Sequence, residues 1–453
     1  MLEGLEISEV RIKDLDSQKR IDAELYNKTY VTFKTAMHNF CHTTLGAECS
    51  MVRKGIFDIK SSQYCDSGIP FVRISNMKDM TIDVSDIVYI PLSEHIRNLK
   101  TELQYGDIVL SKTAIAAASF VNVRECNVSQ DVVAVKLKTD SQLLSHYVVV
   151  FLNTKYGIEQ LQRRFTGNIQ MHLNLDECKN EIVIPVLSPE LQLKTKVLLE
   201  NAIENSKESI KTYQEAKEIL LKELGLWGWE PTNDNKSIKH FIDFITSGRL
   251  DAEFYQPKYD ELEAIIKKSP YRTIAELQTY NARGVQPDYE NDGEIPVVNS
   301  KHILEDGLDY DNFEHTTKDF LGSHERARIG QGDILIYTTG ANIGRAQVYL
   351  KEESAVASNH VNILRVQGVN PIYLAIVLNS QVGRMQTEKL CTGSAQAELY
   401  PTDIEKFVVP ILPDKTQQTI ADYIQKSVSL RQKAKQLLED AKHMVEFEIE
   451  KKL

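Results

Sequence analysis

Arg20-Ile-Asp-Ala-Glu-Leu-Tyr26 returns later in the chain as Arg249-Leu-Asp-Ala-Glu-Phe-Tyr255, which places the two copies 229 residues apart (249 − 20 = 229). Further blocks recur in the same order at nearly this offset: 106–114 at 332–340, 129–137 at 358–366, 147–157 at 373–383, and 164–173 at 390–399. Self-similarity at a fixed spacing is typical of duplicated folding units. We therefore expect two similar lobes, and a protein built from unequal copies suits a target that is itself bipartite.

The composition is that of ordinary globular material, with 453 residues, 42% of them hydrophobic and 26% charged. This length accommodates two units of about 225 residues, each large enough for its own core. No apolar run approaches the ~20 residues that span a bilayer, and the acidic N-terminus is unlike a signal peptide, so we expect a cytoplasmic protein. The net charge of −11 disfavours a polyanion ligand, although a local basic groove can still hold phosphates.

The six cysteines are scattered and contain no C-x-x-C pair. Cys41, His42 and Cys49 lie close enough in sequence to be considered as metal ligands. A second ligand pair is missing, however, so core or surface thiols are the expected reading and no metal site is predicted.

Each half ends in a long stretch with helical periodicity, at 190–226 and 416–453. The apolar residues of both stretches form a narrow heptad-like seam on an otherwise charged helix. The seam residues expected to form the spacer are Ile203, Ile210, Tyr213, Leu220, Val428, Leu438 and Val445. Because the seam is too narrow to be buried against a globular core, we expect the two helices to pair with each other, antiparallel. The alternative is that each helix lies on its own domain.

Short β-branched runs precede each long helix and are bounded by Gly, Pro, Asn or Asp, which predicts strands. These runs are 71–75, 107–111, 131–137 and 181–186 in the first half, and 295–299, 333–337, 360–366 and 407–412 in the second. One helix is expected among them in each half, at 146–165 and 371–390. The predicted fold is α+β: two pseudo-repeated mixed α/β domains joined by two long antiparallel coiled-coil helices. The expected bounds are 1–189 (first domain), 190–226 (central helix), 227–240 (linker), 241–413 (second domain) and 414–453 (C-terminal helix).

A search for catalytic motifs yields only structural explanations. Asn370-Pro-Ile-Tyr373 resembles the motif with which amino-methyltransferases bind a flipped adenine, but a helix N-cap followed by proline explains it. Glu215-Ala-Lys217 and Asp440-Ala-Lys442 have the spacing of half a nuclease site, yet both lie in charged helices. The glycines of 339–345 follow no phosphate-loop pattern and predict a turn. We therefore predict a non-catalytic binding protein with no catalytic residues.

The repeated blocks G-D-I-L-I-x-x-x-G-x-x-x-G-R, S-N-H, T-G-x-x-Q-x-x-L-x-x-x-D-I and V-P-I-L-P-x-x-x-Q-Q, with a terminal coiled-coil helix, resemble the DNA-specificity subunit of type I restriction–modification enzymes. The resemblance covers essentially the whole chain. It implies that each half is a target recognition domain for one half of a split double-stranded DNA site. It also implies that the long helices hold these domains apart and set the number of unread base pairs.

The same resemblance implies partners. Two methyltransferase (modification) subunits would dock on the long helices, and two restriction subunits are optional additions in a phage-defence complex. S-adenosylmethionine, ATP and Mg are then expected in those partners, and this chain itself would need no cofactor.

Base-edge readout uses Arg or Lys for guanine and Asn or Gln for adenine, and the loops after the shared strands are rich in these residues. The first-half candidates for DNA contact are Arg73, Ser75, Asn76, Lys78, Lys112, Thr113, Gln130, Arg163, Arg164, Asn168, Gln170 and His172. The second-half candidates are Asn299, Lys301, His302, Thr338, Thr339, Asn342, Arg345, Asn359, Ser394 and Gln396. Arg163 and Arg164, with the lysines, are the candidates for phosphate contacts. Because these side chains differ between copies whose framework blocks persist, we predict an asymmetric target.

Two alternatives belong to other functional classes. One is a coiled-coil adaptor or anti-restriction decoy that keeps the scaffold without reading DNA. The other is a free-standing methyltransferase or nuclease, which the missing cofactor loop disfavours.

Overall fold

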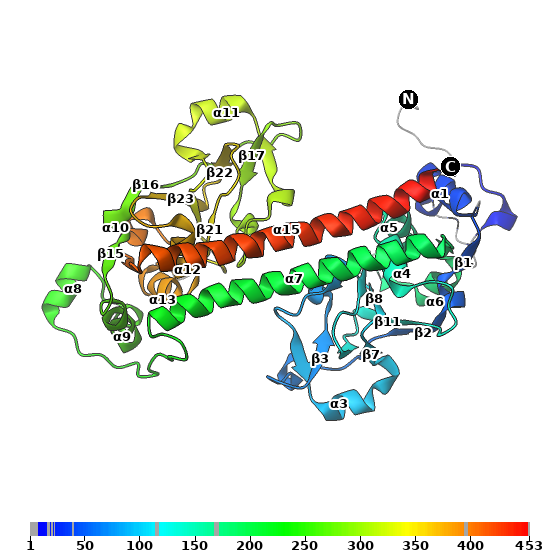
Figure 1. The fold of residues 1–453 in the computed structure, drawn as a ribbon, viewed down its shortest axis with the longest axis horizontal. Coiled ribbons are helices and arrows are strands. Elements are labelled where there is room, and N and C mark those ends of the chain that lie inside the picture. Colours follow the sequence, from blue (N-terminus) through cyan, green and yellow to red (C-terminus); the bar gives the residue numbers. More distant parts are fainter. Residues whose placement is uncertain are drawn as a thin grey trace. The chain divides into compact units, whose positions relative to one another are not determined.

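The computed structural model describes residues 8–15, 19, 21, 23–38, 40–113, 117–166, 172–393 and 397–451 (Figure 1). The chain forms two compact units: unit 1 comprises 1–207 and 431–453, and unit 2 comprises 208–430. Both long helices, α7 (Pro189–Glu223) and α15 (Asp414–Glu450), contribute one part to each unit. The fold is the predicted α+β class, with mixed α/β structure in both units.

Unit 1 is built around a six-stranded sheet and a four-stranded sheet that share a core. The first sheet has the order β2 (Cys49–Lys54), β11 (Val132–Leu137), β8 (Ile108–Ser111), β9 (Ala118–Phe120), β5 (Thr81–Ile82) and β4 (Met77–Lys78). The second has the order β6 (Val88–Ile90), β3 (Ile69–Val72), β10 (Glu125–Val128) and β7 (Leu103–Gln104). Val72 and Val128 of the second sheet lie in one hydrophobic cluster with Val109 and Val132 of the first. Burial of these β-branched side chains is the force that holds the two sheets together.

Shorter elements complete unit 1. Two pairs of strands stand apart from the main sheets: β1 (His42–Thr44) with β14 (Val183–Pro185), and β12 (Phe165–Thr166) with β13 (His172–Leu173). The helices are α1 (Lys28–His38), α2 (Leu45–Glu48), α3 (Leu92–Arg97), α4 (Ser145–Leu152), α5 (Lys155–Gln162) and α6 (Leu175–Glu181).

Unit 2 repeats this plan with two four-stranded sheets. One has the order β16 (Gln278–Arg283), β23 (Val361–Val366), β20 (Ile334–Tyr337) and β21 (Ala346–Val348); the other has the order β18 (Glu314–Thr316), β17 (Ile295–Val298), β22 (Ala355–Ala357) and β19 (Arg328–Ile329). A separate pair joins β15 (Tyr271–Thr273) to β24 (Val408–Pro410). The helices are α8 (Phe241–Ser247), α9 (Pro257–Ile266), α10 (Ile274–Leu277), α11 (Lys318–Ser323), α12 (Pro371–Asn379), α13 (Gln381–Leu390) and α14 (Pro401–Ile404). Each predicted strand overlaps an observed one.

The duplication extends to individual buried hydrogen bonds. Tyr147 Oη donates to the Pro185 carbonyl at 2.7 Å, and Tyr373 Oη donates to the Pro410 carbonyl at 2.7 Å. The Gln160 side chain exchanges two hydrogen bonds with the Val183 main chain. Gln386 forms the same two bonds with the main chain of Val408. A buried polar group is costly without a partner, so this agreement is a strong sign that both copies share one fold.

The single helix predicted at 146–165, and its copy at 371–390, is wrong in detail, because each is two helices with a break. Thr154 caps α5 by accepting a hydrogen bond from Gly157 N, and Ser380 caps α13 by accepting one from Val382 N. Gly157 lies against the end of α4, where an added Cβ would come within 2.3 Å of the Phe151 carbonyl oxygen. The apolar periodicity runs through the break, so it concealed these caps.

Within each unit the parts of α7 and α15 run antiparallel and share one core cluster (Figure 1). Ser209 and Ser427, both fully buried, face each other across the two helices in unit 2. Of the predicted seam, Tyr213, Leu220, Leu438 and Val445 are buried, whereas Ile203 and Val428 are half-buried. Ile210 is 42% exposed, so its assignment to the seam is wrong.

Ile210 was assigned wrongly because small residues form part of the buried face of α7. The buried face of α7 passes through Ala202, Ser209 and Ala216, which are seven residues apart, and small side chains escape a count of apolar residues. The expectation that these helices are too narrow to pack on a globular core is also wrong. In unit 1, Leu199 and Leu438 belong to the same cluster as Phe120 and Val150.

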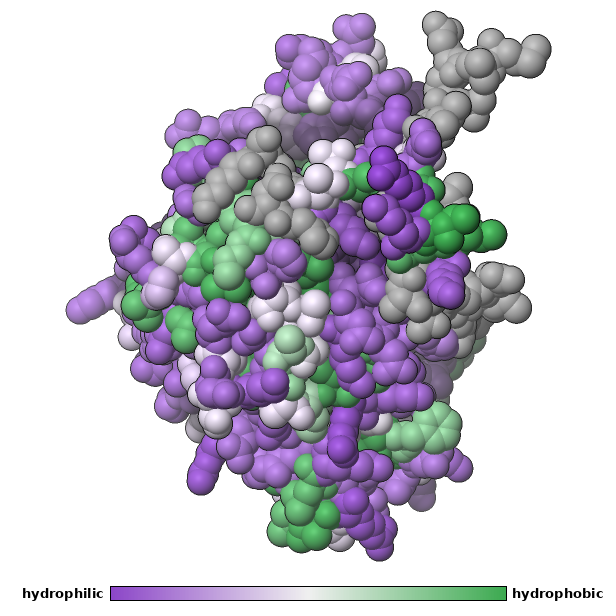
Figure 2. Space-filling model, turned by 90° about the vertical axis from the view of Figure 1, so that its right-hand side faces the viewer, coloured by the Kyte–Doolittle hydropathy of each residue, from purple (hydrophilic) through white to green (hydrophobic). Residues whose placement is uncertain are grey.

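None of the helices in the described part of the chain is long and apolar enough to span a bilayer. The face drawn in Figure 2 is mainly hydrophilic, and its hydrophobic residues lie in small separate groups.

Candidate nucleic-acid interface

Four segments of unit 1 meet at one end of its main sheet. Gly55 N donates to the Val132 carbonyl at 2.9 Å, and Ile56 N donates to the Val128 carbonyl at 2.8 Å. Ser129 N donates to the Val72 carbonyl, and Lys112 N to the Asp131 carbonyl, each at 2.9 Å. We call the surface formed by 53–60, 73–78, 112–113 and 129–131 the loop edge of unit 1. Main-chain bonds fix its geometry independently of its side chains.

Unit 2 has the same loop edge, formed by 282–289, 299–302, 338–339 and 358–360. The four bonds recur as Gly284 N to Val361 O, Val285 N to Ala357 O, Ser358 N to Val298 O, and Thr338 N to His360 O, all between 2.9 and 3.1 Å. The frame of the loop edge is therefore the same in both copies.

Glycine makes the first bend of each loop edge possible. A Cβ on Gly55 would lie 2.1 Å from the Ser129 carbonyl oxygen, and one on Gly284 would lie 2.1 Å from the Ala357 carbonyl oxygen. Only glycine permits so close an approach of two main chains. The chain leaving β2 or β16 is thereby held against the turn that precedes β11 or β23.

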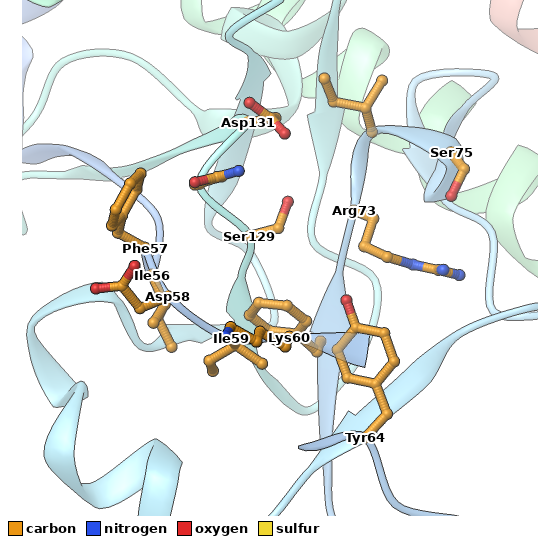
Figure 3. A pocket seen from close by; sticks show the side chains of 13 residues that line it. Ile56, Phe57, Asp58, Ile59, Lys60, Tyr64, Arg73, Ser75, Ser129 and Asp131 are labelled. Atoms are coloured by element: carbon orange, nitrogen blue, oxygen red, sulfur yellow. The ribbon is translucent and has the colours of Figure 1, made fainter. Parts of the chain in front are cut away.

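A hollow of about 550 Å³ lies in the loop edge of unit 1. Figure 3 shows Phe57 on one side of it and Arg73 and Tyr64 on the other, with Ser129 between them. Its apolar lining includes Ile56 and Phe71, which belong to a small buried cluster. Polar side chains thus surround an apolar floor, as in sites that bind partly apolar, partly polar ligands.

The side chains on the two loop edges differ where the frames agree. Corresponding pairs in the first and second copies are Phe57 and Gln286, Arg73 and Asn299, Lys112 and Thr338, Gln130 and Asn359, and Asp131 and His360. The first and last of these pairs are not among the residues predicted from the sequence. The signal that could have found the first is the glycine repeated at 55 and 284, which has the same offset as the opening block.

Most candidates for DNA contact are accessible in part. Exposed or half-exposed in unit 1 are Arg73, Ser75, Lys78, Lys112, Thr113, Gln130, Arg163 and His172. Exposed or half-exposed in unit 2 are Asn299, Lys301, Asn342, Arg345 and Asn359. Asn168, Gln170, Ser394 and Gln396 lie outside the described residues. The loop edges bring together residues near 73, 112 and 130 in one copy and near 299, 338 and 359 in the other.

Two candidates are buried anchors of the loop edge. Asn76 is fully buried, and its Oδ1 accepts the main-chain N–H of Arg73 at 3.0 Å while its Nδ2 donates to Asp86 Oδ1 at 2.7 Å. His302 holds the equivalent place, accepting the N–H of Asn299 through Nδ1 at 3.0 Å. Both side chains therefore shape their loops from beneath, and we remove them from the set that could touch a base.

The acidic partner is repeated as well. In unit 2 the Glu314 carboxylate accepts from Asn299 and Lys301 and lies 3.2 Å from His302 Nε2. Burial tends to raise the pKa of Glu314, but hydrogen bonds from Lys301 and Asn299 outweigh it and hold the pKa below its usual value. Burial lowers the pKa of His302, which favours the neutral ring.

Three more candidates are buried in the described structure. Thr338 is fully buried, and its Oγ1 donates to the His360 carbonyl. Thr339 is 6% exposed, and its buried Oγ1 has no hydrogen-bond partner among the described residues. Arg164 has no exposed surface and pairs with Glu177 and the Tyr30 hydroxyl. A guanidinium so enclosed cannot reach a phosphate, so the expectation that Arg164 contacts DNA is wrong. The expectation that Thr338 contacts DNA is wrong for the same reason, because its side chain is fully buried.

Within the described part of the chain, His95, Glu102 and Glu125 form the one group with ligand atoms close enough to hold a metal ion, all within 4.8 Å. The surroundings of His95 argue against it. Asn127 Oδ1 accepts from Thr101 and from Val128 N, so its amide nitrogen faces His95 Nδ1 at 3.4 Å. Nδ1 must then be the acceptor, which leaves the proton on Nε2 and makes that atom unfit to bind a metal.

Three other sequence features that were considered as chemical sites have structural explanations. Asn370 Oδ1 accepts from Ile372 N and Tyr373 N, so it is the N-cap of α12, with proline in the first turn, as predicted. Residues 340–344 form a turn, as predicted, with Gly340 and Gly344 at positive φ. Burial raises the pKa of Cys49 to about 12, which opposes the thiolate that metal binding requires.

A family model described as the type I restriction modification DNA specificity domain matches residues 268–440. The second copy is thus similar to DNA specificity domains of this family. The resemblance to specificity subunits inferred from the sequence is thereby confirmed. The matched range contains the whole loop edge of unit 2, and the hydrogen bonds shared by the two copies extend the same architecture to unit 1.

Two solved structures give weaker likenesses. One is the type I restriction-modification system S subunit from M. genitalium, with 11% identity, a TM-score of 0.44, and 90% of this chain and 93% of that chain covered. The other is the HsdS subunit from Thermoanaerobacter tengcongensis, with 12% identity, a TM-score of 0.29, and 90% and 96% covered. Neither likeness is close enough to support an argument about this chain. Among curated proteins, no sequence matches it.

Proposed function

We propose that this chain is the DNA-recognition subunit of a type I restriction–modification complex and reads a bipartite, asymmetric DNA site. The observation that carries the proposal is the pair of loop edges, which share four main-chain hydrogen bonds but present different side chains. A constant frame with variable polar groups is what reading two unlike half-sites requires. Arg73 and Gln130 in unit 1, with Asn299 and Asn359 in unit 2, are the main candidates for base contacts.

The long helices supply the second part of the proposal. Their pairing is tight, because small side chains meet at Ser209 and Ser427. A stiff antiparallel pair of this kind sets the number of unread base pairs between the half-sites. Two methyltransferase subunits, with optional restriction subunits, dock on the chain and supply S-adenosylmethionine, ATP and Mg. Flipping and methylation of adenine then take place in those partners.

The charge of the chain fits a subunit that depends on its partners to bind DNA. The lining of the hollow in unit 1 has two basic residues, Lys60 and Arg73, and two acidic ones, Asp58 and Asp131. The whole chain has a net charge of −11. Phosphate binding therefore relies in part on the partner subunits, and the subunit alone is expected to hold DNA weakly.

The test is to sequence methylated adenines in cells with and without this gene. We expect modified sites that appear only with the gene and consist of two different short sequences with a fixed gap. The rival reading, a coiled-coil adaptor or anti-restriction decoy, predicts no new methylated sequence and no salt-sensitive DNA binding in any complex. Methyl transfer by the purified chain alone would overturn the proposal in favour of a free-standing enzyme.

A further inference from the structure

The segment that leaves β2 has an unusual surface. Phe57 is 69% exposed, next to Asp58, which adopts a positive φ of 64°. An aromatic side chain in solvent at the rim of a hollow loses the stabilisation that burial would give it. Folding of unit 1 does not require this exposure, since the floor of the hollow is already closed by Ile56 and Phe71.

Basic residues flank Phe57 on both sides. Arg53, Lys54 and Lys60 are exposed, and none of them forms an ion pair among the described residues. Two other cations of the loop edge are paired with carboxylates: Arg73 pairs with Asp86 at 3.3 Å, and Lys78 pairs with Asp83 at 2.7 Å. Lys112 donates to the Gln130 carbonyl at 3.3 Å. The unpaired cations beside Phe57 point to a polyanion as the ligand of this rim.

The second copy has a different side chain at the same place. Gly55 and Gly284 form equivalent main-chain hydrogen bonds, as do Ile56 and Val285. The next residues, Phe57 and Gln286, are therefore at equivalent positions. Gln286 is also exposed, and its Nε2 donates to the Tyr289 hydroxyl at 3.1 Å. Tyr289 in turn donates to Asn299 Oδ1 at 3.0 Å, which links this position to a candidate base-reading residue.

We infer that residues 53–60 of unit 1 and 282–289 of unit 2 are an additional DNA-reading segment, in which Phe57 contacts a thymine methyl group and Gln286 an adenine. The inference rests on the proposed function. An apolar side chain discriminates thymine through its C5 methyl, whereas a glutamine amide can bind both N6 and N7 of adenine. Duplex DNA, rather than a protein, is the chosen occupant of the rim because the polar groups of Arg73, Ser75 and Gln130 line the same hollow.

The experiment uses the complete complex with its methyltransferase subunits and the site mapped for the wild type. Each thymine of the half-sites is replaced in turn by deoxyuridine, which lacks only the methyl group. One replacement is expected to weaken wild-type binding about 3–5-fold, the value of one buried methyl group. The Phe57→Ala complex should be insensitive to that same replacement. Ile96→Ala is the control, because Ile96 is 58% exposed in the same unit but lies on α3, outside the loop edge and the long helices.

The second copy gives an independent arm. Replacement of one adenine by 7-deazaadenine, which lacks N7, should weaken the wild-type complex but leave Gln286→Ala unchanged. The inference is overturned if no thymine is sensitive in the wild type, or if Phe57→Ala keeps the sensitivity. It is also overturned if Phe57→Ala loses methyltransferase subunits without altered DNA reading, since Phe57 would then face a protein. In each of these cases a wild-type complex that still methylates a split site leaves the proposed function standing, whereas a complex without any specific site removes that too.

Discussion

Ser209 and Ser427 form a reciprocal pair in which each hydroxyl donates to the other's main-chain carbonyl at 2.8 Å. The two hydroxyl oxygens are 3.0 Å apart, and both side chains are fully buried. Such an arrangement requires the helix backbones to lie close together, so larger side chains cannot be accommodated. The pair therefore defines the register of α7 against α15 within unit 2.

Substitutions of Ser209 and of its neighbour Ile210 test this register. Ser209→Ile is expected to reduce the free energy of unfolding by about 1–3 kcal/mol, because it overpacks a closed contact. Ile210→Ser should change it by less than about 0.5 kcal/mol, because Ile210 is 42% exposed. Denaturant unfolding measures both. A larger loss for Ile210→Ser than for Ser209→Ile would restore the seam predicted from the apolar pattern.

Loss of the first glycine of a loop edge should affect one half-site only. Gly55→Ala places a Cβ 2.1 Å from the Ser129 carbonyl oxygen, so the loop edge of unit 1 must shift. Methylation mapping should then show relaxed or lost reading of one half-site, and Gly284→Ala should do the same at the other. Gly322→Ala in α11 is the control, because nothing lies within 4 Å of its added Cβ. Equal damage at both half-sites from either variant would contradict separate readers.

Arg164 is predicted to stabilise the fold rather than bind DNA. Arg164→Met leaves Glu177, which is buried, without its charged partner and should cost about 3–5 kcal/mol of unfolding free energy. The slope of DNA affinity against salt should be unchanged in the folded complex. Arg53→Gln is the contrast, since loss of one phosphate contact reduces that slope by about 1. A reduced slope for Arg164→Met would reinstate it as a phosphate ligand.

His146 should make unit 1 sensitive to acid. Burial lowers the pKa of His146 to about 4 from 6.5, although Glu200 partly opposes this. Between these two values the unfolded chain binds a proton that the folded chain does not, so stability falls as the pH is lowered from 6.5 towards 4. His146→Ile, the residue that unit 2 has at position 372, should remove this part of the pH dependence. The measurement is the unfolding free energy of both proteins against pH, and parallel curves would refute the assignment.

The sequence predicted the architecture well because its signals are local. Runs such as 131–137 and 360–366 are β-branched and buried on both faces, so the strands are found within a few residues. The helix break at Thr154 depends on a cap and a close glycine contact, which apolar periodicity does not register.

The candidate site was harder to predict for a physical reason. Arginine, asparagine and histidine serve equally as readers and as buried anchors, and only the structure separates Arg164, Asn76 and His302 from half-exposed Arg73. Phe57 carries none of the polar groups by which base-reading residues are predicted, and an aromatic side chain is informative only when its exposure is known.

The central claim, that one helix pair measures the distance between two independent readers, can be tested by lengthening both helices. One heptad is inserted into α7 beside Ser209 and one into α15 beside Ser427, which preserves the seven-residue spacing of the buried face. Seven residues add about 10.5 Å of helix, or roughly three base pairs of DNA. Mapping of methylated adenines should show both half-site sequences unchanged and the gap between them longer by about three base pairs. Altered half-site sequences with an unchanged gap would contradict the account.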